Sequence, residues 1–232
     1  MGLKESGLRG SLRNVSTGVV AIPDSAILEI DATQDDLDDQ DSVPEVPDFS
    51  GEGNDLSGSG ATYLTDVQNG QPAYDFETGD IYDNPGVGVI SQPFTIVATV
   101  QQDDTNDWNH IFSSTQEDGD TRAHHSQEFD ANQWRTRVGE DELSGGDNET
   151  DWIVSTLVVN GSDSALRVNG SDIVTGTLGG GWEGFQIGDS YFGGAVDMRA
   201  GILLFADDDL SDTGELGGEE QRQADIYGIS LD

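Results

Sequence analysis

The chain has 232 residues, of which 46 are acidic and nine are basic, so its formal net charge at neutral pH is −37. This balance argues against a nucleic-acid partner, because few side chains could neutralise phosphates. The absence of cysteine excludes disulfides and thiolate chemistry. The longest apolar run, residues 201–206, is far too short to insert into a membrane.

The acidic residues indicate an adaptation to salt. Thirty-two of the 46 acids are Asp, and a single base is Lys. A compact fold with this charge repels itself at low ionic strength, and concentrated salt screens the repulsion. The composition is therefore typical of a haloarchaeal protein or of a protein from a virus of such a host. The other interpretation, an acidic disordered chain, is disfavoured by 17 aromatic residues set within alternating apolar runs.

Charge divides the first part of the chain. Residues 1–13 hold three of the nine bases, and residues 24–55 hold twelve acids and no base. The acidic block at 31–41 is expected to stay outside any core, and the two prolines that follow it indicate an extended spacer. We predict a docking arm and acidic linker at 1–47 and a compact domain at 48–232. The expected docking residues are Leu3, Lys4, Leu8, Arg9, Leu12 and Arg13.

From residue 48 onward, alternating apolar and polar residues predict strands at 93–101, 133–138 and 195–205. Residues 152–159 are apolar on both faces, as in a central strand, and a short helix is predicted at 218–227. Many short strands separated by Gly-rich turns predict an all-β, antiparallel two-sheet jelly-roll sandwich. The alternating faces expected to point inward carry Phe94, Ile96, Ala98, Val100, Trp134, Thr136, Val138, Val196, Met198, Ala200, Ile202 and Leu204.

Two Asn-Gly-Ser-Asp blocks, beginning at Asn160 and Asn169, bracket one short predicted strand. Asn-Gly favours a tight hairpin turn, because both central residues must adopt positive φ. Asn-x-Ser is also the acceptor pattern for N-glycosylation. We interpret both blocks as turns, with glycosylation compatible because turn tips are exposed.

The order of several motifs resembles the laminin G-like, concanavalin A-like jelly-roll family. DFSGEGNDL at 48–56 comes first, LRVNG at 166–170 forms a hairpin, and IGDSYFGGAVDMRAGI at 187–202 precedes the last helix. The resemblance implies two antiparallel sheets, one of them concave, with ligand sites at the rim or in the groove. GLRGSLRNVSTGVVAIPDS near the start resembles the lead of laminin G-like structural proteins of haloarchaeal tailed viruses.

Sugar recognition uses an exposed aromatic platform beside hydrogen-bonding groups. Trp108 on an acidic loop and Trp182 in a Gly-rich stretch are the expected platforms. Arg135 and Arg137 share one strand face, with Arg122 nearby in the sequence. These arginines either contact a ligand or pair with acids across the strands.

Calcium is the cofactor that the sequence suggests, because Ca²⁺ prefers six to eight oxygen ligands. The opposing interpretation is that any loop of this chain is acid-rich merely to stay solvated. The candidate ligands are Asp103, Asp104, Asp107, Asp118, Asp189 and Asp197.

Catalytic patterns are weak. Glycosidases of this fold carry paired carboxylates on one strand face, but Glu140 and Glu142 are expected in a loop. His124 and His125 are adjacent, so they should point to opposite faces of a strand, and we expect them and His110 to be surface histidines. We predict that the chain is not an enzyme.

Together these patterns predict a structural protein on the surface of a haloarchaeal tailed virus: a turret, spike, fibre head or decoration of capsid or tail. The arm would bind other virion proteins, and the jelly roll would project as a symmetric homo-oligomer that binds host surface glycans. The alternative is a carbohydrate-binding module of a haloarchaeal cell-surface or secreted protein. A glycosidase with a degenerate motif is a third interpretation.

Dilution of salt tests the interpretation of the charge. We expect the β-sheet circular dichroism spectrum to be lost when KCl falls from molar to millimolar concentration, because unscreened carboxylates repel one another. Equal melting temperatures at both concentrations would show that the acidity is not a requirement for folding.

Overall fold

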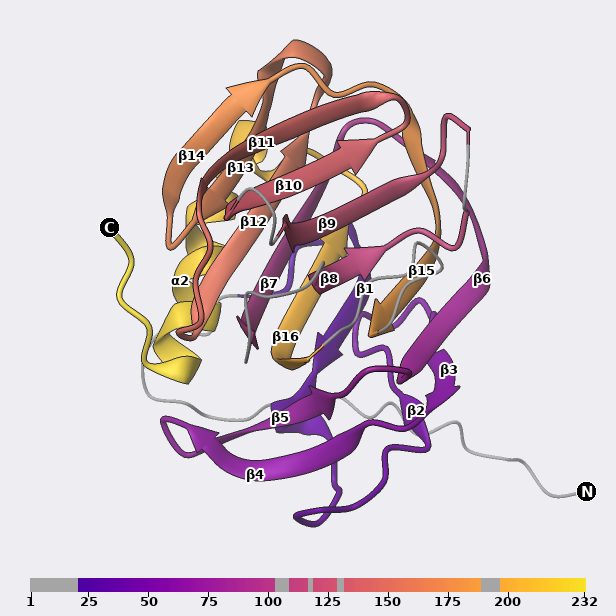
Figure 1. Ribbon diagram of the computed structural model, residues 1–232, viewed down its shortest axis with the longest axis vertical. Helices are drawn as coiled ribbons and strands as arrows, with labels where there is room; N and C mark the ends of the chain where they lie inside the picture. The colour runs from indigo at the N-terminus through magenta and orange to yellow at the C-terminus, as the bar shows by residue number, and fades with distance from the viewer. Residues whose placement is uncertain (1–20, 103–108, 117–118, 129–131, 189–196) are drawn as a thin grey trace, which may run out of the picture.

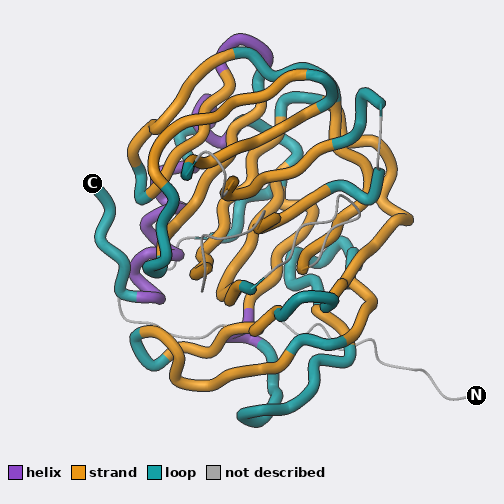
Figure 2. The backbone as a smooth tube through the Cα atoms, viewed as in Figure 1, coloured by secondary structure: helices purple, strands orange, loops and turns teal. Residues whose placement is uncertain are grey.

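The computed structural model describes residues 21–102, 109–116, 119–128, 132–188 and 197–232. Two antiparallel sheets pack face to face, and one helix covers the outer face of one sheet (Figures 1 and 2). The predicted all-β jelly-roll sandwich is confirmed. The three layers are the helix, sheet A and sheet B.

Sheet A runs in the order β14-β13-β12-β7-β16-β5-β4, and β1 also pairs with β16. Its strands are β1 (Ala26–Asp31), β4 (Thr62–Gln68), β5 (Gln71–Phe76), β7 (Phe94–Gln102), β12 (Ile153–Val159), β13 (Ser164–Val168), β14 (Ser171–Gly176) and β16 (Met198–Ala206).

Sheet B runs in the order β11-β10-β9-β8-β15-β6-β3-β2. Its strands are β2 (Glu45–Val46), β3 (Leu56–Ser59), β6 (Ile81–Ser91), β8 (Asn109–Ser113), β9 (Ala123–Glu128), β10 (Gln133–Val138), β11 (Asp141–Asp147) and β15 (Gly181–Gly188). Two short 3-10 turns, η1 (Ala32–Gln34) and η2 (Gly161–Asp163), complete the β part of the chain.

Two helices follow the last strand, α1 (Leu210–Thr213) and α2 (Leu216–Tyr227). The helix predicted at 218–227 is therefore confirmed, with an additional first half-turn. Gly228 ends it with a φ of 68°, a conformation that favours glycine. Among the described residues, no helix is long and apolar enough to cross a membrane.

Strand β7 lies in the middle of sheet A, and both of its faces are buried. Phe94 and Ile96 point into the core between the sheets, as the alternation predicts, while Val97 belongs to a second apolar cluster on the side of α2. All of β12 is buried for the same reason. A strand covered on both sides needs few polar side chains, which explains why Ser155 and Thr156 are the only polar residues of β12.

Strand β16 departs from the predicted alternation. The register with β7 shifts between Ala200 and Ile202, so Gly201 is an extra residue in the strand. Beyond this bulge, Leu203 and Phe205 enter the core between the sheets, in the places predicted for Ile202 and Leu204. A bulge inserts one residue and exchanges the faces that follow it, and simple alternation does not anticipate this.

The predicted boundary near residue 47 does not separate the described residues. Strand β1 pairs with β16, and Leu28 and Ile30 are fully buried in the core. Residues 26–46 are therefore part of the sandwich and not a linker. Four apolar residues before the acidic block lie in β1, and the short strand β2 lies between the two prolines that follow the block. Residues 1–20, including the predicted docking residues, lie outside the described part of the chain.

The DFSGEGN motif at 48–54 fastens β1 to the sandwich. The Asp48 carboxylate accepts hydrogen bonds from the backbone of Glu29, at 2.9 Å, and of Ser50, at 2.8 Å. The Asn54 side chain donates to the carbonyl of Ile27, at 2.7 Å. The motif therefore has a structural role, and these hydrogen bonds account for its Asp and Asn residues without a ligand.

A buried ion pair joins β1 to α2. Arg222 donates from Nη2 to Glu29 at 2.8 Å and to Glu219 at 2.7 Å. Glu29 and Glu219 are 0% and 1% exposed. Burial raises the pKa of Glu29 to about 7, although Arg222 offsets part of the effect.

Glu29→Gln tests this burial. The folded protein holds the Glu29 proton more tightly than the unfolded chain, so its stabilising effect is present below about pH 4.5 and is lost as the pH rises to about 7. The glutamine of this variant carries no proton to lose, so the variant avoids a loss of roughly 3 kcal/mol in the free energy of unfolding at pH 7. We expect its free energy of unfolding to rise relative to the parent between pH 5 and pH 7 in denaturant titrations at fixed molar salt. Glu140→Gln, on a 79% exposed side chain, is the control, and a pH-independent difference for Glu29→Gln would contradict the assignment.

Candidate functional site

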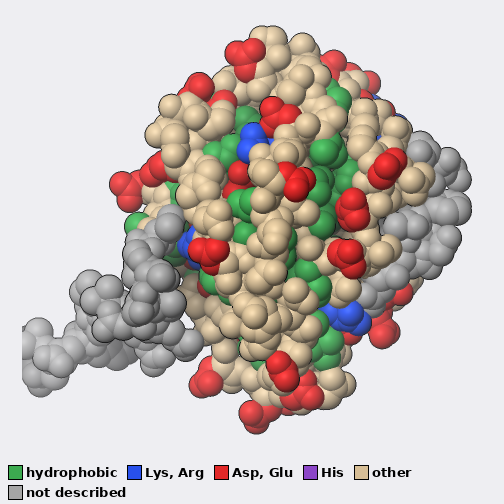
Figure 3. Space-filling view, turned by 90° about the vertical axis from the view of Figure 1, so that its left-hand side faces the viewer, with side chains coloured by type: hydrophobic (Ala, Val, Ile, Leu, Met, Phe, Trp, Pro, Cys, Tyr) green, Lys and Arg blue, Asp and Glu red, His purple; other side chains and the backbone are tan. Residues whose placement is uncertain are grey.

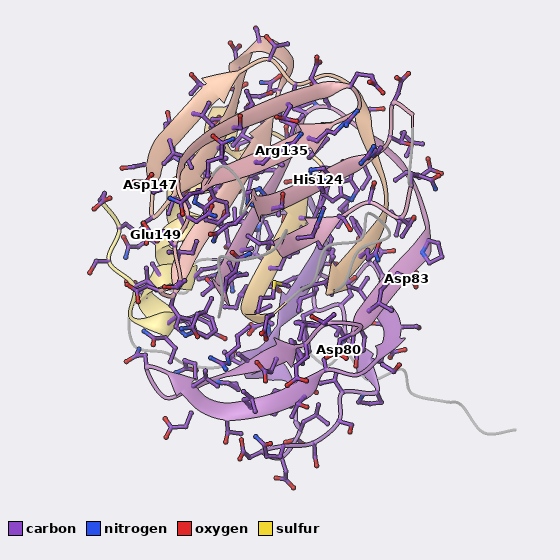
Figure 4. The ribbon with its side chains drawn as sticks, viewed as in Figure 1. Asp80, Asp83, His124, Arg135, Asp147 and Glu149 are labelled. Atoms are coloured by element: carbon purple, nitrogen blue, oxygen red, sulfur yellow. The ribbon has the colours of Figure 1, made fainter. Side chains whose placement is uncertain are left out.

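A hollow of about 420 Å³ lies where the β11–β12 loop, the β13–β14 turn and the residues after α2 meet. Figure 3 faces the side of the molecule on which Asp147 and Glu149 lie in Figure 4, and there acidic side chains surround a strip of exposed apolar ones. The lining combines amides, carboxylates, an indole and aliphatic groups. It comprises Gln68, Gln101, Glu149, Asp151, Trp152, Ile153, Asn169, Gly228, Ile229 and Ser230.

Trp152 is the aromatic residue of this hollow, and the ring of Tyr227 packs against it. Its indole stacks on the Tyr227 ring, with centroids 5.2 Å apart and planes 17° apart. Tyr227 is fully buried, and its hydroxyl donates to the carbonyl of Pro72 at 2.7 Å. The half-buried indole therefore has a fixed orientation before any ligand arrives.

The β11–β12 loop is fixed by two glutamines. The buried Gln127 side chain accepts from the backbone N–H of Glu149, at 3.0 Å, and donates to its carbonyl, at 3.1 Å. Gln101 donates to the carbonyl of Thr150 at 3.3 Å and accepts from Arg199 at 3.0 Å. The Glu149 carboxylate projects from a loop whose backbone is already satisfied.

The second Asn-Gly block forms another wall. Asn169 and Gly170 have φ values of 49° and 83°, as a type I′ hairpin turn requires. The Asn169 side chain accepts from the backbone of Val154 at 2.9 Å, and its carbonyl accepts from Asp232 at 2.9 Å. The prediction of a turn is confirmed, and the turn also lines the hollow.

The first Asn-Gly block also turns the chain, through η2. Asn160 has a φ of −148° and a ψ of 61°, and a type I′ turn needs positive φ at this position, so this is not a type I′ turn. The Asn160 side-chain amide donates to Asp209 at 2.8 Å.

A second hollow of about 220 Å³ adjoins the first, since Glu149 and Asn169 line both. Its other walls are apolar residues, a serine and carboxylates. They are Trp134, Asp147, Val168, Ser171, Ile173 and Asp232.

Trp182 is not an exposed platform, which corrects the prediction. It lies in β15, is 0% exposed and stacks on Phe112 with centroids 5.4 Å apart. The glycines around it suggest a surface loop, but they continue a strand whose register turns the indole inward. Trp134, predicted in the core, is indeed fully buried.

Arg135 and Arg137 share the outer face of β10, as predicted, and both are paired. Arg135 lies 2.5 Å from Glu142, and Arg137 lies 3.4 Å from Glu140. The prediction of a loop at 140–142 is wrong for its second part, because β11 begins at Asp141 and places Glu142 opposite Arg137. The interpretation as a cross-strand ion pair accounts for Arg135, while Arg137 pairs with Glu140 in the turn that follows β10.

The three histidines are buried, contrary to the expected surface positions. His124 and His125 do point to opposite faces of β9. His125 lies inside the sandwich, 2.8 Å from the Thr136 hydroxyl and 2.6 Å from the Ser155 hydroxyl, so it links the two sheets. Burial lowers its pKa to about 3, which keeps it neutral.

His110 and His124 lie on the outer face of sheet B, with ring centroids 4.8 Å apart. Burial, together with the charges of Arg122 and Arg135, lowers the pKa of His110 to about 4. Figure 4 shows His124 and Arg135 together over sheet B, apart from Asp147 and Glu149. This cluster is where the structure places Arg122 and Arg135.

Several predicted site residues lie outside the described part of the chain: Trp108, Asp103, Asp104, Asp107, Asp118 and Asp189. Asp197 is exposed just before β16. Within the described segments, no three His, Asp or Glu side chains are grouped to hold a metal. Calcium binding by the undescribed loops stays a prediction.

No protein-family model and no curated protein sequence matches the chain. Solved structures of similar fold include a Trypanosoma rangeli sialidase in complex with 2,3-difluoro-KDN, with 15% identity, a TM-score of 0.58, and coverage of 82% of this chain and 31% of the sialidase. Another concerns botulinum neurotoxin type C, whose cell entry depends on two ganglioside molecules, with 13% identity, a TM-score of 0.60, and coverage of 85% and 52%. A third is the binding domain of botulinum neurotoxin DC in complex with rat synaptotagmin II, with 12% identity, a TM-score of 0.56, and coverage of 82% and 50%.

These likenesses establish the fold of the chain. The chain spans about a third of the sialidase and about half of each toxin chain. Sequence reasoning missed Trp152 because it directly precedes a buried strand and seemed part of it. It missed Gln68 and Gln101 because amides at strand ends carry no motif.

Proposed function

We propose that this chain is a glycan-binding β-sandwich and that the hollow at Trp152 is its binding site. The orientation of Trp152 on Tyr227 carries the proposal. Sugars present flat C–H faces that pack on an aromatic ring and a belt of hydroxyls that needs hydrogen-bonding partners. The side-chain amide of Gln68 lines the same hollow as the indole and is such a partner, while Gln101 and Asn169 use amide atoms to hold the walls.

The size of the hollow supports this assignment. About 420 Å³ falls in the range of roughly 300–1,000 Å³ that small-ligand sites occupy. The fold neighbours lend support of another kind, because one of them is a toxin that interacts with gangliosides. We propose binding without catalysis, and a bound oligosaccharide recovered intact by mass spectrometry is the expected result.

For the biological setting, we propose the surface of a haloarchaeal tailed virus, on the capsid or the tail. The support is the charge of −37 and the basic lead at residues 1–13. The sandwich would project as a symmetric homo-oligomer and bind host surface glycans, with the lead docked on other virion proteins. A carbohydrate-binding module of a haloarchaeal surface protein is the alternative, and it would use the same hollow.

Binding to a glycan array in molar KCl tests the site. We expect Trp152→Ala and Gln68→Ala to weaken binding by at least about tenfold, since both remove direct contacts at the centre of the site. Trp152→Ala also removes the ring that stacks on Tyr227, so the melting temperature of each variant is measured in parallel. Asp151→Ala, at an exposed position of the lining, should weaken binding at nearly unchanged stability.

Val89→Ala serves as the control, because Val89 is a 57% exposed apolar residue of β6 and no part of the hollow. Array signals for Gln68→Ala and Asp151→Ala that equal those of Val89→Ala would rule out this hollow as the glycan site.

Deleting residues 1–20 tests the docking role of the lead. Strand β1 begins at Ala26, so we expect the shortened chain to fold and to keep its glycan binding. It should fail to co-sediment with virus particles that lack the protein, because the basic contacts to acidic neighbours are gone. Incorporation at the level of the full chain would assign docking to the sandwich itself.

A further inference from the structure

The two adjoining hollows have a common charge character. Glu149 lines both, Asp151 lines the first, and Asp147 and Asp232 line the second. Neither lining includes a lysine, arginine or histidine. A ligand that carried its own carboxylate would therefore meet carboxylates and no described cation among the lining residues.

The arginines behind these walls do not change that character, because each is paired with acids. Arg199 lies 3.1 Å from Asp75 while it holds Gln101. Arg167, on β13, lies 2.9 Å from Glu220 and 2.7 Å from Asp172. Their positive charges are matched before a ligand arrives.

The salt concentration determines which charges of the protein interact with a ligand. In ~1 M salt the screening length is about 3 Å, so the net charge of the whole surface is not felt at a distance. Only carboxylates in contact with the ligand keep their effect, because direct contact also removes the water that would solvate both groups. Selection by charge must therefore come from the lining itself.

The shared walls also set the length of the ligand. Glu149 and Asn169 separate the hollow at Trp152 from the one bounded by Val168 and Ile173. Because the two hollows share these residues, a chain of sugars that packs one unit on Trp152 would place a further unit at the second hollow. The apolar walls there fit the C–H surface of a further unit or an acyl substituent.

We infer that the paired hollows select an uncharged oligosaccharide of at least two units and exclude sugars that carry a carboxylate or sulfate. The inference rests on the proposed function and adds the class of ligand.

The experiment uses matched pairs of oligosaccharides, such as lactose and 3′-sialyllactose, on an array and then in calorimetric titrations of the strongest neutral binder and its acidic counterpart. Both are measured in 1 M and 3 M KCl. We expect the neutral member to bind at least about tenfold more tightly at both concentrations, since unfavourable charge contacts cost this much or more. Glu149→Gln should narrow the ratio of neutral to acidic affinity severalfold, because it removes a carboxylate that faces the acidic ligand.

Glu140→Gln is the matched control, because it makes the same change of charge at an exposed residue outside both hollows. Equal or tighter binding of the acidic members by the parent protein, through Trp152, would overturn the inference and leave the proposed function intact. An equal change in the ratio of neutral to acidic affinity in Glu149→Gln and Glu140→Gln would also overturn the inference and leave the proposed function intact. An array with no bound glycan of either class would overturn both.

Discussion

The close packing of Tyr227 against Gly201 is the contact on which much of this structure depends. A side chain at position 201 would collide with the Tyr227 ring, so glycine there lets α2 lie on sheet A. The same ring supports Trp152, and the segment after α2 forms one wall of the hollow. One contact between helix and sheet thus brings α2 against sheet A and positions the proposed binding surface.

Two of the arginines are placed where carboxylates are buried. Arg167 and Arg222 bind Glu220 and Glu219, two acids of α2 that are 2% and 1% exposed. A buried charge without a partner is very costly, so an acidic helix can pack on a sheet only with such cations. These pairs are also screened less by salt than exposed ones. The chain therefore combines an acidic surface with paired charges at its internal contacts.

The chemistry of the hollow suits the same solvent. Stacking on an indole and hydrogen bonds to amides involve no net charge, so concentrated salt weakens them little. The walls around Trp152 are held by hydrogen bonds of Gln127, Gln101 and Asn169 and not by exposed ion pairs. Rigid contacts to an indole and to amides can bind a ligand when electrostatic attraction is screened.

The sequence by itself determined the class of fold, because alternation in β10 and the continuous apolar run of β12 report burial directly. It also determined the second hairpin, since Asn169–Gly170 meets a local demand for positive φ. Tertiary structure alone decided the inward face of Trp182, the exchange of faces at Gly201 and the membership of β1 in sheet A. Each of these depends on which strand lies alongside, and such pairing joins residues far apart in the chain. Tertiary structure also decided the hollow at Trp152, because its walls come from five separate segments that meet only after the sheets and α2 have packed.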